Sequence, residues 1–205
     1  MRISSKAQRS LLVAAFASLS FNLVAAPAFA ATAWNESVDG DLSSDGLAPT
    51  PLQFVPGSNT VKGSMGSGDI DYFRFTVPSG ALLTAVNVNP STSVSGAQSF
   101  FAIQVGTQIT VTPTGGGTGP GSLLAFDHYD VADIGTNLLA RLMPNSTGLP
   151  AGAYSIWLNE TGGVAPYSFD FVLSSVPEPA AAGLFVTGLG ALVLRMRMAR
   201  SHRGC

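Results

Sequence analysis

The run IDYFRFTV, residues 70–77, decides the fold of this 205-residue chain. Its apolar side chains recur at every second position, so that Phe73, Phe75 and Val77 fall on one face. The alternate positions carry Tyr72, Arg74 and Thr76. A period of two is the pattern of a β-strand with one face buried. The run therefore predicts a half-buried antiparallel strand, which a Pro-Ser-Gly turn at residues 78–80 ends.

Similar runs follow along the chain. The best defined are residues 154–159 and 167–174, where aromatic or branched side chains alternate with smaller or polar ones around a Thr-Gly-Gly turn. Further strand candidates are residues 81–89, 98–105, 108–112 and 137–143, with a hairpin turn at 106–107. Residues 31–51 are acidic and rich in turns. Short strands between glycine-rich turns, without an amphipathic helix, predict an all-β fold, an antiparallel β-sandwich.

The first thirty residues have the features of a secretory signal peptide. Arg2, Lys6 and Arg9 form a basic start, and residues 11–23 are mostly apolar. Ala28 and Ala30 then flank Phe29 in a small-residue cleavage site. This order predicts export, with removal of residues 1–30.

The other end has the features of a membrane address. Val176, Pro177, Glu178 and Pro179 precede residues 180–194, which carry no charge. At 1.5 Å per residue that segment spans about 22 Å, a marginal transmembrane helix. The arginines that follow, Arg195, Arg197, Arg200 and Arg203, predict a cytoplasmic end. A buried core helix is the alternative, but such a helix rarely lacks a polar face and ends in arginines.

Together the two ends resemble those of the PEP-CTERM proteins of Gram-negative bacteria. The resemblance covers residues 176–203. It implies that exosortase, a membrane-embedded cysteine protease or transpeptidase, recognises Val176 to Pro179 and passes the product to the cell surface or an exopolysaccharide matrix. The expected organisation is a signal peptide at 1–30, an extracytoplasmic domain at 31–175 and a sorting signal at 176–205.

A second resemblance lies within the domain. Residues 69–80, DIDYFRFTVPSG, and 149–156, LPAGAYSI, are similar to two motifs of bacterial pre-peptidase C-terminal domains. The similarity covers roughly residues 39–175. It implies a jelly-roll-like sandwich without catalytic activity, and some members bind calcium or carbohydrate.

The negative charge of the expected domain limits the kinds of partner that it can bind. Between residues 31 and 175 stand three basic and eleven acidic residues, a formal charge of −8. Nucleic acid is excluded as a partner, because phosphate contacts need clustered Lys and Arg. Divalent cations or cation-bridged polysaccharide fit this charge better. The alternative is that acidity only keeps an exported protein soluble.

Calcium is the best-motivated ligand. Carboxylates on turns can supply the six to eight oxygens that Ca²⁺ takes. The candidate ligands lie in the acidic segment and at the entry to the first strand: Asp39, Asp41, Asp45, Asp69 and Asp71. The alternative is that these aspartates only form turns.

Catalysis and sugar binding are weaker interpretations. His128, beside Asp127, is the one histidine between residues 31 and 175, and no Gly-x-Ser-x-Gly nucleophile motif occurs. Trp157 and Tyr72 fall opposite the main apolar stripes of their strands and are candidates for stacking on a sugar. We therefore expect an exported, non-catalytic surface or matrix protein; a lectin-like module or a hydrolase centred on His128 are the alternatives.

Overall fold

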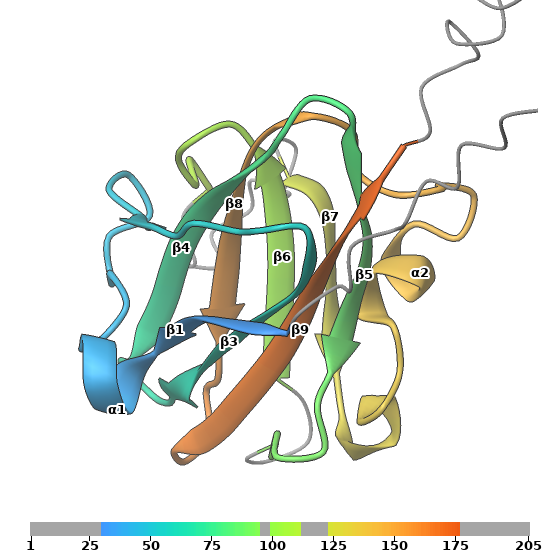
Figure 1. Ribbon diagram of the computed structural model, residues 1–205. Helices are drawn as coiled ribbons and strands as arrows, with labels where there is room; N and C mark the ends of the chain where they lie inside the picture. The colour runs from blue at the N-terminus through green and yellow to red at the C-terminus, as the bar shows by residue number, and fades with distance from the viewer. Residues whose placement is uncertain (1–29, 95–98, 112–122, 177–205) are drawn as a thin grey trace, which may run out of the picture.

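The computed structural model describes residues 30–94, 99–111 and 123–176 (Figure 1). Their strands form two sheets that face each other around one apolar core. The four-stranded sheet has the spatial order β1 (Ala31–Asn35), β3 (Gly57–Met65), β9 (Ala165–Ser175) and β5 (Ala81–Val88). The five-stranded sheet has the order β2 (Thr50–Pro51), β4 (Ile70–Val77), β8 (Gly152–Asn159), β6 (Ser99–Val105) and β7 (Leu123–Tyr129). The described residues also form three short helices at the periphery: α1 (Glu36–Asp39), a 3₁₀ turn (Val131–Asp133) and α2 (Leu138–Leu142).

The core between the sheets is built by the period-two stripes. Phe73 and Phe75 of β4 face Phe169 and Phe171 of β9, and all four side chains are almost completely buried. The Phe171 ring lies at the centre, with its centroid 5.6 Å from those of both Phe73 and Phe75. Burial of these rings removes a large apolar area from water and is the main stabilising contribution to the sandwich.

The all-β fold is confirmed, and so are the strands with a clear alternation. The run at residues 70–77 is β4, and it pairs antiparallel with β8 along its whole length. The expected strands at 154–159 and 167–174 lie within β8 and β9. Those at 81–89 and 98–105 correspond to β5 and β6 within one residue at each end.

Two of the expected strands are wrong. Within the expected strand at 137–143, Leu138–Leu142 form α2; the Asn137 side chain accepts a hydrogen bond from the Ala140 backbone N–H and so caps the helix start. Of the expected strand at 108–112, the described residues 108–111 form a loop, with the Ile109 side chain buried and the Thr110 N–H bonded to the Gln104 side chain. The expected hairpin at 106–107 is therefore absent, since no strand follows it there.

Four strands were not predicted from the sequence: β1, β2 and β7 at sheet edges, and β3 beside β1. The inner face of β3 carries Asn59, Val61, Gly63 and Met65, so its apolar alternation is broken by an amide and a glycine. β1 pairs with β3, and β2 with β4, in parallel. The expectation of a purely antiparallel sandwich is thus wrong at two sheet edges and correct for the other pairs.

The expected sorting sequences lie almost wholly outside the described residues. Ala30 and Val176 are the first and last described positions, so Ala28, residues 177–179, the helix at 180–194 and the arginines after it stay predictions. Within the part of the chain that is described, no helix is long and apolar enough to cross a membrane.

The central ring of the core provides a test of this packing. Replacing Phe171 by Ala should lower the free energy of unfolding by about 3–5 kcal/mol, because the cavity left between the sheets cannot collapse. Phe126→Ala removes a ring that is 46% exposed and should change stability far less. Urea denaturation followed by tryptophan fluorescence measures both. Equal losses for the two variants would contradict the assignment of Phe171 to the core.

Candidate metal centre

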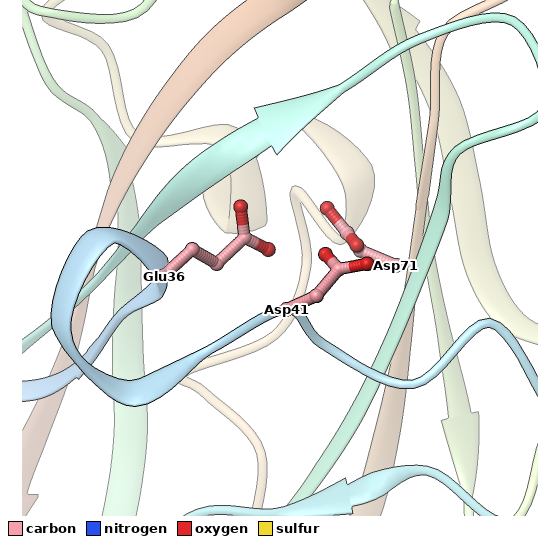
Figure 2. Close-up of side chains that lie close together, drawn as sticks. All are labelled: Glu36, Asp41 and Asp71. Atoms are coloured by element: carbon pink, nitrogen blue, oxygen red, sulfur yellow. The ribbon is translucent and has the colours of Figure 1, made fainter.

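Three carboxylates converge at one end of the sandwich (Figure 2). They belong to Glu36, Asp41 and Asp71, and each offers an oxygen within 4.8 Å of the others. Glu36 begins α1, Asp41 follows that helix, and Asp71 is the second residue of β4. The cluster therefore joins the segment after β1, in one sheet, to a strand of the other sheet.

Asp71 is placed by the same alternation that builds the core. It precedes Phe73 on the inner face of β4 and lies opposite Leu158 of β8. Its exposed fraction is 0%. Neither carboxylate oxygen has a hydrogen-bond partner among the described residues, and the nearby Tyr167 hydroxyl donates its one hydrogen bond to Glu36. A buried ionised carboxylate without a partner is costly, so it must either take up a proton or bind a cation.

Glu36 is held over the edge of β3. β1 ends at Asn35, and the chain then turns so that Glu36 Oε2 accepts a hydrogen bond from the Ser64 backbone N–H at 2.7 Å. Tyr167 donates its hydroxyl proton to Oε1 at 3.1 Å. Gly63 makes this position available, because a Cβ there would overlap the Glu36 carboxylate.

Asp41 covers the cluster from the solvent side. Gly40, with φ +90°, turns the chain between α1 and Asp41, and Asp41 itself is exposed. An ion would therefore reach the buried Asp71 past an exposed carboxylate, which is an open entry path.

The electrostatics of the cluster favour a proton or a cation on Asp71. Burial, followed by the neighbouring charge of Glu36, raises the pKa of Asp71 to about 8. Burial also raises the pKa of Glu36, against the hydrogen bonds from Ser64 and Tyr167 that lower it. The pKa of Tyr167 is raised by burial and by the charge of Asp71, so its hydroxyl remains a donor.

The donor set points to a hard divalent cation. All three side chains offer oxygen, and no His or Cys belongs to the group. Carboxylate oxygens suit Ca²⁺ and Mg²⁺ rather than zinc or copper. Two exposed or half-exposed carboxylates with a buried one can supply several of the six to eight oxygens of Ca²⁺ and leave room for water on the Asp41 side.

Of the five aspartates proposed from the sequence, the structure brings two together, Asp41 and Asp71. Asp39 accepts a hydrogen bond from the Asn35 backbone N–H at 2.8 Å. Asp45 accepts one from the Leu47 backbone N–H at 2.8 Å. The turn-forming interpretation therefore holds for Asp45, and Asp39 closes the α1 turn.

Asp69 lies beside the cluster without being a member of it. Burial, then the charge of Asp41, raises the pKa of Asp69. Its carboxylate thus adds negative charge near the three converging groups and would attract a cation toward them.

Glu36 was not among the residues proposed from the sequence. It is 35 positions from Asp71 along the chain, and no short motif links the two. Only the parallel pairing of β1 with β3 and the turn into α1 bring the two carboxylates together. The available signal is Gly63, whose missing side chain leaves space for the Glu36 carboxylate, but this signal can be recognised only once the strand pairing is known.

The two aromatic residues proposed for sugar stacking are buried. Tyr72 is 3% exposed and Trp157 is 6% exposed, and their ring centroids are 5.9 Å apart. They lie on the outer face of the five-stranded sheet, as expected, but Ile109 and Phe100 pack against them. The expectation that these rings are surface platforms is therefore wrong.

His128 lies on the exposed outer face of β7. Its ring contacts Phe100 edge-on, with centroids 5.4 Å apart. The adjacent Asp127 forms an ion pair with Arg141 at 3.3 Å. Among the described residues, no hydrogen bond joins the His128 ring to a serine, threonine or carboxylate. The prediction that the chain is not an enzyme is not tested by this arrangement.

Comparison of the chain with protein-family models, with curated proteins and with solved structures gives no match. The resemblances of the two ends and of the domain motifs to known families therefore stay predictions.

Gly63→Ala should disable the centre while leaving the sandwich folded. The added methyl group would displace the Glu36 carboxylate, whereas the backbone at Gly63 is not among the positive-φ positions that favour glycine. We expect calcium affinity to fall at least about tenfold, because one of three charged ligands moves away. Isothermal titration gives the affinity and far-UV circular dichroism gives the fold. Unchanged calcium affinity in a folded variant would contradict the position of Glu36.

The pKa of Asp71 predicts an unusual pH dependence for the metal-free protein. The folded-state pKa of about 8 lies above the value of 3.8 for an unfolded chain, so protonated Asp71 contributes its stability fully below pH 4 and loses it as the pH rises through 8. Glu36 and Asp69 shift in the same direction. In a chelator, thermal unfolding should show stability falling over this range by up to about 1 kcal/mol per pH unit. Stability that rises from pH 4 to 8 would rule out a buried proton here.

Proposed function

We propose that this protein is an exported, non-catalytic binding module that takes Ca²⁺ at the Glu36–Asp41–Asp71 centre. One observation carries the metal assignment: Asp71 is completely buried, its two oxygens lack hydrogen-bond partners among the described residues, and two further carboxylates lie against it. A divalent cation satisfies all three charges at once, which no neighbouring lysine or arginine does in the described part of the chain.

Export and surface location are supported by the sequence. The A-x-A site at residues 28–30 and the VPEP motif with its apolar and basic continuation favour delivery to the cell surface or an exopolysaccharide matrix after exosortase processing. The resemblance of residues 69–80 and 149–156 to pre-peptidase C-terminal domains supports the finer fold assignment, a jelly-roll-like sandwich. It also supports calcium as the ion.

An ion that is abundant outside cells suits an exported module. Because the centre ties the segment after β1 to β4, binding Ca²⁺ would stabilise the contact between the two sheets at this end. The proposed role is therefore structural and adhesive, with the ion as part of the folded module rather than as a catalyst.

Calcium should raise the melting temperature of the wild-type protein by about 5–10 °C at a concentration near one hundred times the Kd. Asp71→Asn keeps the shape of the side chain but removes its charge, so the shift should vanish. Asp45→Asn is the matched control, because an Asn side-chain oxygen can still accept the Leu47 hydrogen bond. Differential scanning fluorimetry with calcium or a chelator measures all three proteins.

Two results would contradict the proposal. A calcium-induced shift that survives Asp71→Asn would place the ion elsewhere. Mass spectrometry of the protein in its host tests the export part separately, and a product found only in the cytosol with residues 1–30 and 176–205 attached would rule it out.

A further inference from the structure

A groove lined mostly by polar residues opens beside the metal centre, on the surface of the four-stranded sheet. Its volume is about 530 Å³. Four segments line it: Asn35 and Ser37 at the end of β1 and start of α1, Lys62 of β3, Ser91 in the loop after β5, and Ser168 of β9. Glu36 lines the groove as well and so belongs to both the groove and the metal centre.

Three of these residues stand in one row across the sheet. In the strand register Asn35 lies opposite Lys62, and Lys62 lies opposite Ser168. Side chains at paired positions point to the same face of a sheet, so an amide, an ammonium and a hydroxyl line up along the groove. The row is made of rigid strand positions rather than of loop tips.

The side chains of this row offer hydrogen-bond donors that make no hydrogen bond to the described residues. Lys62 is exposed, and it forms no ion pair or hydrogen bond with them. Asn35 Oδ1 accepts a hydrogen bond from Ser37 at 2.9 Å, which directs its Nδ2 donors away from Ser37. Ser168 is 5% exposed at the floor of the groove, and its Oγ accepts a hydrogen bond from Asn89 at 3.0 Å, which leaves the Ser168 proton to donate. A row of donors with one positive charge suits an anionic acceptor such as a carboxylate.

We propose that this groove binds the carboxylate of an acidic sugar residue in a polysaccharide chain. The carboxylate pairs with Lys62 and accepts hydrogen bonds from Asn35 and Ser168. The rim hydroxyls of Ser37 and Ser91 face the sugar hydroxyl groups. A sugar fits better than an acidic peptide because the lining offers hydroxyl and amide groups and no deep apolar recess for a peptide side chain.

Binding of the acidic sugar is coupled to the metal. This step rests on the proposed function. Without an ion, the carboxylates of Glu36 and Asp41 repel an incoming anion, whereas bound Ca²⁺ offsets their negative charge. Because Glu36 borders the groove, calcium should strengthen sugar binding without touching the sugar itself.

The experiment uses isothermal titration of the purified protein with a short glucuronic-acid oligosaccharide, with a neutral glucose oligosaccharide of equal length and with an oligoglutamate peptide. In calcium, the acidic sugar alone should bind. Lys62→Gln should weaken that binding about tenfold or more, the effect of losing one charge-assisted hydrogen bond. Arg74→Gln removes the same charge from the other sheet and should leave it unchanged.

The remaining arms separate the groove from the metal centre. Calcium binding is measured on the same samples without sugar, and Lys62→Gln should retain it. Asp71→Asn should lose calcium binding together with the calcium-dependent part of sugar binding. If the Lys62→Gln variant binds calcium and still holds the acidic sugar as tightly as the wild type does, the groove alone is overturned. Equal binding of the neutral sugar or of the acidic peptide would overturn the ligand class.

Discussion

The structure depends on one constraint: a carboxylate, Asp71, stands at the end of an inner stripe of phenylalanines. Every other position of that stripe in β4 is apolar and builds the contact between the sheets. A buried charge at this position is costly on its own, so it must be neutralised by a proton or by a bound cation. In the assignment proposed above, Asp71 holds a proton in the metal-free protein or shares a divalent cation with Glu36 and Asp41. This end of the sandwich would then hold the ion, and the apolar core fills the remainder.

The ion site and the groove are linked through Glu36. Its carboxylate accepts hydrogen bonds from the Ser64 backbone N–H, at the edge of β3 where β1 ends, and from the Tyr167 hydroxyl, and the same residue lines the groove. One side chain thus takes part in edge protection, ion binding and the charge of the ligand groove. In the proposed scheme, this shared residue would let the ligand and the ion reinforce each other without touching.

Much of the fold could be predicted from the sequence, because β4, β8 and β9 alternate with a clear period of two, and β5 and β6 are short apolar runs next to turn residues. β3 could not, since its buried positions include Asn59 and Gly63, which only the contacts of a finished fold explain. The leucine-rich run of α2 has no marked polar face and so resembles a strand in the sequence. The hydrogen bond by which Asn137 caps the helix is seen only in the structure. The proposed ion site could likewise be predicted only in part. Asp41 and Asp71 were recognisable as acidic residues in a turn and at the start of a strand, whereas Glu36 joins them only through the pairing of β1 with β3.

The bare backbone at Gly63 has an evolutionary consequence. Any codon change that replaces this glycine adds at least a methyl group, and here that group meets the Glu36 carboxylate and not the core. If the proposed site is correct, a Gly63→Ala change in this lineage would remove ion binding in one step while the strand keeps its backbone. Descendants that look intact by shape could differ in chemistry by one carbon atom.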